Sequence, residues 1–318
     1  MLGRVLIAGA GAIGSVIGGL LQKQGENITL LGRPEHIRAI ARNGLEIEGI
    51  WGEHRVSGFE LASDPAELGP DFDLIFLTVK SYDTNSAIRE VAPKLKSSGL
   101  VVSAQNGLGN LEAVAQVVGP ERTLGGRVIF GAEILSPGKA KVTVYADPVM
   151  IGGFTPELSI NLKHKIEKIV TMLTQAGVPS GYAEEIRPYL WAKILYNCPL
   201  NPLGALLDVN YGALADNPDT RKIMEEVIRE IFLVARAEEV ALFWKEPDQY
   251  AREFFERLVP ATRNHRASMI GDLKRNKPTE IEAMNGWILK LGEKHGIPVP
   301  YNEALTRMIR FRAKKLES

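Results

Sequence analysis

The chain has 318 residues, and its 38 basic and 38 acidic side chains give it a formal net charge of zero. A chain of this length is expected to form about two domains, and the balanced charge argues against a nucleic-acid-binding protein, which needs a basic surface. No apolar run approaches the ~18 residues of a membrane span, the N-terminus lacks the features of a signal peptide, and the single cysteine suits a reducing, cytoplasmic compartment.

The first half of the chain alternates between short apolar runs and helical patterns. Residues 4–8 and 27–31 are typical of strands, and a Gly-rich turn and a helix to about residue 24 lie between them. The pattern then predicts a helix at 34–43, short strands within 45–61, a buried strand at 73–79, a helix at 84–95, and strands at 100–103, 126–131 and 139–152. This alternation predicts an α/β domain of the Rossmann type, with a doubly wound parallel sheet covered by helices on both faces.

The second half has helical periods and no strand-like runs. The predicted helices lie at 186–196, 220–239, 248–258 and 280–295. We therefore expect an N-terminal Rossmann-type domain over residues 1–180 and an all-α domain over residues 181–318. No flexible spacer separates them, so a cleft between the two domains is the expected ligand site.

The sequence GAGAIG at residues 9–14 predicts a dinucleotide site. A lone GxGxxG pattern is a weak signal, but this one follows a predicted strand and begins a helix, as the motif requires. Its first glycine allows the tight turn, the second lets the backbone approach a pyrophosphate, and the third lets helix and strand pack closely. The predicted cofactor-binding residues here are Gly9, Gly11, Ala12, Ile13 and Gly14. The alternative is a purely structural turn.

The end of the second strand bears on the type of cofactor. NAD-binding proteins commonly place an acidic residue there to hold the ribose 2′-hydroxyl, whereas this chain has Arg33 after Gly32. An arginine pairs well with a 2′-phosphate, so NADP(H) is favoured over NAD. The alternative is that Arg33 is a solvated loop residue and Glu35 holds the ribose.

Two polar residues follow later strands of the predicted sheet. Lys80 comes after the buried strand at 73–79, and Asn106 comes after the strand at 100–103. Ligands of parallel α/β sheets bind at this edge, so both residues are candidates for contact with the cofactor. Either one alone is also compatible with an ordinary loop.

Lys193, Asn197 and Asn201 are spaced four residues apart, so they share one face of a predicted helix. Asn201 continues the row only if the helix persists past Pro199, which can kink it. The residues between them are mainly apolar. Lys193 is therefore either a functional cation or a lysine that extends its ammonium into water.

Glu280 lies in a segment that fits a capping box formed by Thr279 and Glu282. Taken alone, Glu280 is then a helix-start carboxylate that serves the helix dipole. The five histidines show no metal-ligand spacing, so no metal site is predicted. Cys198 has no evident partner base and is expected to be a small buried residue.

With these residues in view, nearly the whole chain resembles the ketopantoate reductase (2-dehydropantoate 2-reductase) family. The Lys-x-x-x-Asn-x-x-x-Asn-Pro element, with a Thr-Glu-Ile downstream, is far more specific than the Gly-rich motif. The resemblance is carried by GAGAIG at 9–14, Lys80 in LTVKSYD, QNGLG at 105–109, WAKILYNCPLNPL at 191–203, Ser268-Met269 with Asp272, and TEIEAMNG at 279–286.

The resemblance implies an enzyme that reduces 2-dehydropantoate to (R)-pantoate with NADPH in pantothenate biosynthesis. The first domain would then bind NADP and the second the substrate. Lys193 would be the catalytic acid that protonates the forming alkoxide, and Glu280 would be the second catalytic residue, which holds the substrate hydroxyls. Lys80 would contact the cofactor. The implied substrate or nicotinamide contacts are Asn106, Asn197, Asn201 and Ser268.

Two positions depart from the family pattern. The family often has an asparagine three residues before the serine, where this chain has His265, and an Asn-Gly pair where this chain has Asn210-Tyr211-Gly212. Both places would touch the substrate, so the identity of the keto acid is the open point, more than the type of reaction.

The alternatives are a reductase that converts another branched or aromatic 2-keto acid to a D-2-hydroxy acid, and a non-catalytic NADP-binding regulator. The expected partner is a small 2-keto acid, with no nucleic acid and no membrane. A helical domain of this kind can also mediate a homodimer.

Overall fold

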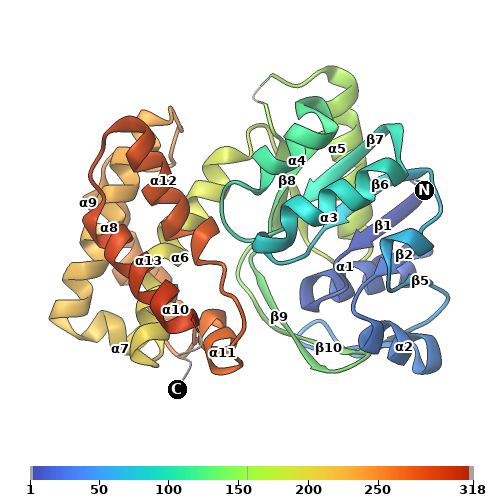
Figure 1. Ribbon diagram of the computed structural model, residues 1–318, viewed down its shortest axis with the longest axis horizontal. Helices are drawn as coiled ribbons and strands as arrows, with labels where there is room; N and C mark the ends of the chain where they lie inside the picture. The colour runs from blue at the N-terminus through green and yellow to red at the C-terminus, as the bar shows by residue number, and fades with distance from the viewer. Residues whose placement is uncertain (1–2, 156, 315–318) are drawn as a thin grey trace. The chain divides into compact units, whose positions relative to one another are not determined.

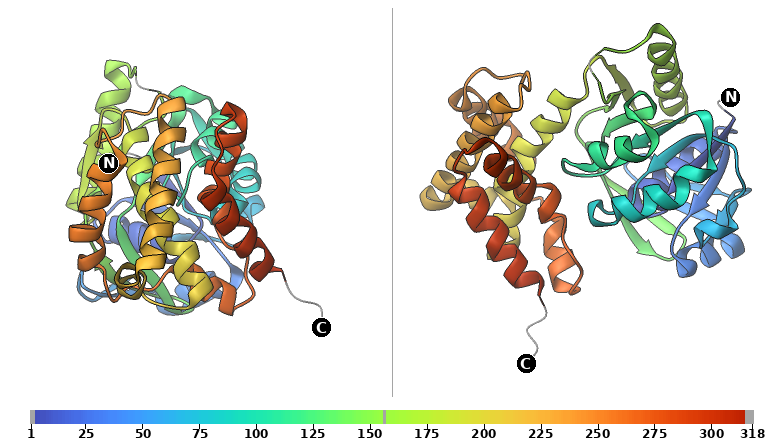
Figure 2. Two further views of the ribbon diagram at one scale, coloured as in Figure 1. Left: turned by 90° about the vertical axis from the view of Figure 1, so that its left-hand side faces the viewer. Right: turned by 45° about the horizontal axis from the view of Figure 1, so that its top comes forward.

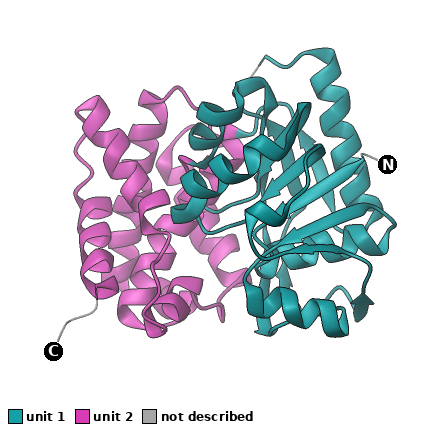
Figure 3. Cartoon of the chain, turned by 45° about the vertical axis from the view of Figure 1, so that its right-hand side comes forward, with its two compact units in different colours: residues 1–106, 110–186 teal, residues 107–109, 187–318 magenta. Residues whose placement is uncertain are grey.

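The computed structural model describes residues 3–155 and 157–314, which form two compact units (Figure 1, Figure 3). Unit 1 falls within residues 1–106 and 110–186, and unit 2 within 107–109 and 187–318. The sequence pattern placed the boundary six residues earlier, after residue 180. The short segment 107–109 joins unit 2 because the amide of Leu108 donates to the carbonyl oxygen of Ala283 at 2.7 Å. Terminal residues 1–2 and 315–318 of the predicted domains lie outside the described ranges.

Unit 1 is built on an eight-stranded sheet. Six of its strands are parallel to one another, β11 runs antiparallel to β8, and β12 is parallel to β11. In spatial order the strands are β12 (Ser180–Ala183), β11 (Val149–Gly153), β8 (Thr123–Arg127), β7 (Leu95–Ser103), β6 (Phe72–Leu77), β1 (Arg4–Ala8), β2 (Asn27–Leu31) and β5 (Glu60–Ala62). The predicted doubly wound parallel sheet is confirmed, with an antiparallel extension at one edge.

The strand register brings the carboxyl ends of four strands to one edge. Ala8 at the end of β1 lies opposite Leu31 of β2 and Leu77 of β6, and Leu77 lies opposite Ser103 of β7. The loops that follow these strands therefore begin side by side. In parallel α/β sheets this is the edge at which ligands bind.

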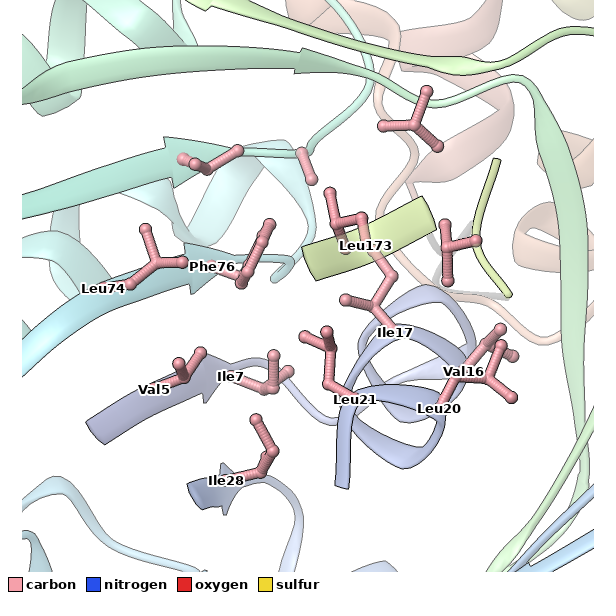
Figure 4. Packing of buried hydrophobic residues seen from close by; sticks show 14 of the residues in the cluster. Val5, Ile7, Val16, Ile17, Leu20, Leu21, Ile28, Leu74, Phe76 and Leu173 are labelled. Atoms are coloured by element: carbon pink, nitrogen blue, oxygen red, sulfur yellow. The ribbon is translucent and has the colours of Figure 1, made fainter. Parts of the chain in front are cut away.

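Helices cover both faces of this sheet because successive side chains of a buried strand point to opposite sides. On one face, α1 (Ala12–Lys23) and α5 (Ile160–Gln175) pack in a cluster with Val5 and Ile7 of β1. Figure 4 shows Ile17 and Leu21 of α1 pointing toward β1. On the other face, α3 (Thr84–Val91) and α4 (Asn110–Val118) pack against the opposite side of β1.

A second sheet covers the outer side of α1. Its four strands are β4 (His54–Val56), β3 (Leu45–Gly49), β10 (Lys139–Tyr145) and β9 (Phe130–Ser136), in that order. The sequence pattern predicted strands in these regions but not a separate sheet.

Two adjacent glycines of α1 face the two sheets. If Gly18 carried a Cβ, that atom would lie 2.7 Å from a methyl carbon of Leu30 in the first sheet, and a Cβ on Gly19 would lie 2.5 Å from Ile47 in the second. The paired glycines therefore let α1 fit between two sheets.

Unit 2 is all-helical, as predicted (Figure 2). Its longest helix, α6 (Arg187–Leu207), contacts α8, α11 and α13. The other helices are α7 (Tyr211–Asp216), α8 (Pro218–Ala237), α9 (Pro247–Glu253), which continues into a π-helical turn (Phe254–Leu258), α10 (Val259–Ala261), α11 (Ser268–Lys274), α12 (Asn285–His295) and α13 (Pro300–Ala313).

Helix α6 continues through Pro199 and Pro202. Because Pro202 has no N–H, the carbonyl of Cys198 loses its usual helical donor. The side chain of Asn285 replaces that donor, with its Nδ2 at 3.1 Å from the Cys198 oxygen and at 2.9 Å from Oδ1 of Asn302. Asn302 in turn donates to the buried carboxylate of Glu230 at 2.7 Å. This chain of buried hydrogen bonds stabilises the proline-containing part of α6.

Candidate active site

The Gly-rich turn that follows β1 is fixed by the protein itself. Gly9 has a φ of 114°, which glycine adopts readily, and the amides of Gly9 and Ala10 both donate to the carbonyl of Leu31, at 3.0 and 2.8 Å. A Cβ on Gly9 would lie 2.5 Å from the amide nitrogen of Val79, and one on Gly14 would lie 2.3 Å from the carbonyl oxygen of Gly9. Two of the three motif glycines are therefore required by the fold.

Gly11 is different, because no steric contact among the described residues requires a glycine there. Its backbone is extended (φ −83°), and a Cβ would meet no atom closer than 3.9 Å. Gly11 is the exposed N-cap residue of α1, and Ala12 and Ile13 are the first two residues of the helix. A helix N-terminus with free N–H groups and no Cβ in front of it fits a pyrophosphate. The predicted dinucleotide site is consistent with this geometry.

Arg33 lies directly beside this turn. It is the exposed N-cap of α2 (Pro34–Asn43), two residues beyond the end of β2. A Cβ on the intervening Gly32 would lie 2.8 Å from Cβ of Ala10, so the loop that carries Arg33 packs against the Gly-rich turn. The alternative ribose ligand, Glu35, is exposed in the first turn of α2.

Lys80 and Asn106 both lie at the ligand-binding edge of the sheet, half-buried, after β6 and β7. Their loops are joined by Gln105, whose Nε2 donates to the carbonyl of Val79 at 3.0 Å and to Oγ1 of Thr84 at 2.7 Å. Sequence reasoning missed these supporting residues. The sequence alone carries no signal for them, because their hydrogen bonds join residues more than twenty positions apart.

Asn110 completes the support of this edge. Its Oδ1 accepts from Thr84 at 2.8 Å, and its Nδ2 donates to the carbonyl of Asn106 at 2.9 Å. The backbone of Asn106 is therefore held by a hydrogen-bond network that includes the buried side chains of Thr84 and Asn110.

In unit 2, α6 carries Lys193, Asn197 and Asn201 as the predicted row, because the helix persists past both prolines. Lys193 and Asn197 are half-buried, and Asn201 is only 6% exposed. Asn201 accepts a hydrogen bond from the hydroxyl of Tyr211 at 2.5 Å, and its Nδ2 lies 3.8 Å from the sulfur of Met284. The row therefore runs from a half-buried cation to a buried amide.

The predicted capping box at Thr279 is wrong. Only a short 3₁₀ turn, Ile281–Ala283, follows it, and the helix proper begins at Asn285. Among the described residues, the buried hydroxyl of Thr279 has no hydrogen-bond partner, and Glu282 instead pairs with Arg310 of α13 at 2.6 Å. The ion pair with Arg310 occupies the Glu282 carboxylate that a capping box would use, so a tertiary contact replaces the local one.

Glu280 is 6% exposed, whereas Glu282, two residues further along, is an exposed surface residue. A buried carboxylate needs specific partners, and Glu280 has such an interaction within the protein. Ser268, the first residue of α11, is exposed. The contact of Asn201 with Met284, four residues after Glu280, places the two predicted substrate segments next to each other.

Cys198 is fully buried, and burial raises the pKa of its thiol, so it is not a nucleophile. Among residues 3–155 and 157–314, no cluster of three His, Cys, Asp or Glu side chains could hold a metal ion. Within the same ranges, no helix has the length and apolar character to cross a membrane.

A doubly wound sheet with a Gly-rich turn after β1 is the arrangement found in dinucleotide-binding enzymes. Two family models match: "Ketopantoate reductase PanE/ApbA" over residues 5–155 and its C-terminal counterpart over residues 185–313. The chain belongs to the ketopantoate reductase family, as the sequence resemblance predicted.

Individual relatives agree with this assignment. The chain is 39% identical to a 2-dehydropantoate 2-reductase of Aquifex aeolicus over 99% of its own length and 98% of the relative's. A crystal structure of a ketopantoate reductase from Ralstonia eutropha JMP134 matches with a TM-score of 0.88, 31% identity and coverage of 99% and 100% of the two chains. D-mandelate dehydrogenase, solved with NADH and anilino(oxo)acetate, matches with the same TM-score and coverage at 25% identity.

Proposed function

We propose that this chain reduces the ketone of 2-dehydropantoate to (R)-pantoate with NADPH, as a step in pantothenate biosynthesis. The observation that carries the proposal is the full-length similarity to the Aquifex 2-dehydropantoate 2-reductase. The site residues fit the reaction, because it needs a hydride donor, an acid and neutral donors for a carboxylate and hydroxyls.

Unit 1 is proposed to hold the cofactor. The turn at Gly9, Gly11 and Gly14, with the N–H groups of Ala12 and Ile13, would bind the pyrophosphate. We propose NADPH over NADH because Arg33 stands where NAD-binding proteins place an acid. Lys80 and Asn106 would contact the cofactor from the ends of β6 and β7. When bound, the nicotinamide supplies the hydride.

Lys193 is the proposed acid. Hydride addition to a ketone builds negative charge on its oxygen, and a positioned ammonium both stabilises that charge and gives the proton. Lys193 lies on a long helix, and the two residues after it, Ile194 and Leu195, are fully buried, so its backbone position is well defined. Removing the ammonium would remove both effects.

The remaining residues are proposed to bind the keto acid. Asn106, Asn197, Asn201 and Ser268 would donate hydrogen bonds to its carboxylate or other oxygens. Glu280 would accept hydrogen bonds from its hydroxyl group, a role that only an acceptor can fill. The proposal requires that the keto acid meet both Lys193 and the nicotinamide at the same time.

A second candidate is a reductase of another 2-keto acid, with the same lysine mechanism. Two observations favour testing it: D-mandelate dehydrogenase shares the fold at 25% identity, and His265 and Tyr211 depart from the family pattern. A non-catalytic NADP-binding regulator would retain the Gly-rich turn but would not need the lysine, the amides and the carboxylate. Cytoplasmic location and homodimer formation remain predictions.

The test is the rate of NADPH oxidation with 2-dehydropantoate, measured beside branched and aromatic 2-keto acids, with NADH in parallel. Clear preference for 2-dehydropantoate and NADPH supports the proposal. Preference for another keto acid establishes the second candidate, and dinucleotide binding without turnover of any keto acid establishes the regulator.

A further inference from the structure

The buried amide of Asn201 has a defined orientation because Tyr211 fixes one side of it. The hydroxyl of Tyr211 donates to Oδ1 of Asn201 at 2.5 Å. With Oδ1 engaged, the NH₂ group must point to the other side. There, among the described residues, its protein partner is the sulfur of Met284 at 3.8 Å. A thioether is a weak acceptor, so the amide retains most of its capacity to donate to a ligand oxygen.

Tyr211 is itself held by its backbone and its neighbours. It begins α7, where its amide donates to the carbonyl of His265 at 3.0 Å and the next amide, of Gly212, donates to the carbonyl of Arg263 at 2.9 Å. The side chain of Asn210 caps the helix by accepting from Ala213 at 2.9 Å. Tyr211 therefore cannot shift without breaking the attachment of α7 to the loop before α11.

The ring of Tyr211 is also restricted. It lies edge-on to the His265 ring, with centroids 5.2 Å apart, and to the Tyr196 ring at 6.1 Å. His265 and Tyr211 are the two positions at which the sequence departs from the family pattern, and the structure places them in direct contact. The two departures therefore belong to one arrangement.

Burial decides how Tyr211 can act. Its side chain is 2% exposed, so it has almost no surface with which to touch a substrate. Burial also raises the pKa of its hydroxyl, which therefore stays protonated and available as a donor over the neutral pH range. Its one hydrogen-bonded side-chain partner among the described residues is Asn201.

We propose that Tyr211 is a positioning residue, which presents the NH₂ group of Asn201 to a carboxylate or keto oxygen of the substrate. This inference rests on the proposed function, in which Asn201 binds the keto acid. A reversed amide would present its own carbonyl oxygen to the substrate oxygen, which would repel it. Tyr211 thus sets the affinity for the keto acid without contacting it.

The test compares Tyr211→Phe with Tyr196→Phe. Both substitutions remove one hydroxyl and keep the ring. The hydroxyl of Tyr196 bonds to Oγ1 of Thr262 at 2.5 Å, away from Asn201, so Tyr196→Phe is a matched control. For each variant, we would measure kcat and KM with the keto acid that the wild type prefers, the Kd for NADPH by fluorescence, and the melting temperature.

Tyr211→Phe is expected to raise KM for the keto acid about tenfold, the effect of losing roughly 1.4 kcal/mol of binding. The Kd for NADPH should stay at the wild-type value, and Tyr196→Phe should leave KM unchanged. Wild-type KM in Tyr211→Phe would overturn the inference while leaving the proposed function intact. Equal increases in KM in both variants would reduce Tyr211 to a structural role, and no turnover by the wild type would overturn both proposals.

Discussion

Nε2 of His36 lies 3.0 Å from the hydroxyl of Ser15, so a buried imidazole on α2 is tied to the helix that begins at the Gly-rich turn. The amide of Gly138, in the turn between β9 and β10, donates to Nδ1 of the same ring at 3.0 Å. Since Nδ1 accepts, Nε2 carries the proton and donates to Ser15. One neutral histidine therefore joins α1, α2 and the second sheet.

This arrangement predicts a pH dependence of stability. Burial lowers the pKa of His36 below its usual 6.5, because the charged form loses solvation. Since the unfolded chain takes up the proton at a higher pH than the folded chain, the contribution of neutral His36 to stability is fully present above pH 6.5. It is lost as the pH falls through the lower folded value.

The variant His36→Gln keeps a donor and an acceptor but has no proton to gain. Its melting temperature should fall less than that of the wild type between about pH 7 and pH 5. The exposed His164 on α5 provides the control, since His164→Gln should follow the wild-type curve. Parallel curves for wild type and His36→Gln would refute the role given to His36.

The motif glycines are expected to separate stability from cofactor binding. Gly11→Ala places its methyl group where the nearest protein atom is 3.9 Å away, so the fold should be unaffected. The methyl group would lie where the pyrophosphate has to approach, so the Kd for NADPH should rise about tenfold or more.

Gly14→Ala is the contrasting variant. It puts a carbon 2.3 Å from the carbonyl oxygen of Gly9 and should destabilise the protein by about 1–3 kcal/mol. Thermal melts and NADPH titrations of both variants would check this, and a stable Gly11→Ala variant with unchanged NADPH affinity would contradict it.

Arg33→Ala is expected to discriminate between the two nicotinamide cofactors. A hydrogen bond to a charged group contributes about 1.5–3 kcal/mol, so the Kd for NADPH should rise about tenfold or more. The Kd for NADH, which lacks the 2′-phosphate, should change little. Titration of both cofactors measures the ratio directly, and equal losses for NADPH and NADH would show that Arg33 does not bind the 2′-phosphate.

Glu280 and Glu282 offer a matched pair of carboxylates. Glu280→Gln removes a buried charge that is proposed to accept from the substrate hydroxyl, so KM for the keto acid should rise about tenfold. Glu282→Gln weakens an exposed ion pair with Arg310, which contributes about 0–1 kcal/mol, and should leave KM unchanged. If Glu280→Gln lowers only the melting temperature, its role is structural.

Much of this fold could be predicted from periodicity. The strands at residues 4–8 and 27–31 and the helix at 34–43 occur where predicted, because each combines a clear apolar pattern with Gly or Pro at its ends. The antiparallel extension and the second sheet were missed. Which strands pair depends on contacts between residues such as Lys139 and Glu46, far apart in the sequence, and local patterns carry no such information.

The site was predicted unevenly for similar reasons. The row Lys193, Asn197 and Asn201 follows from helical spacing, but its continuation past Pro202 depends on Asn285, more than eighty residues away in sequence. The predicted capping box at Thr279 failed because a tertiary arrangement overrode a local motif. Supporting residues such as Gln105 and Tyr211 act through their hydrogen bonds, which only the fold reveals.

The proposed function requires Lys193 to give a proton to the keto acid while NADPH supplies the hydride. The most direct test is the turnover of 2-dehydropantoate by wild type and Lys193→Ala, with the Kd for NADPH measured on the same preparations. Positioned acids contribute about 10²–10⁴-fold to rate, so kcat should fall by at least about a hundredfold while the NADPH Kd stays the same. A Lys193→Ala variant that retains most of its turnover would show that Lys193 is not the acid.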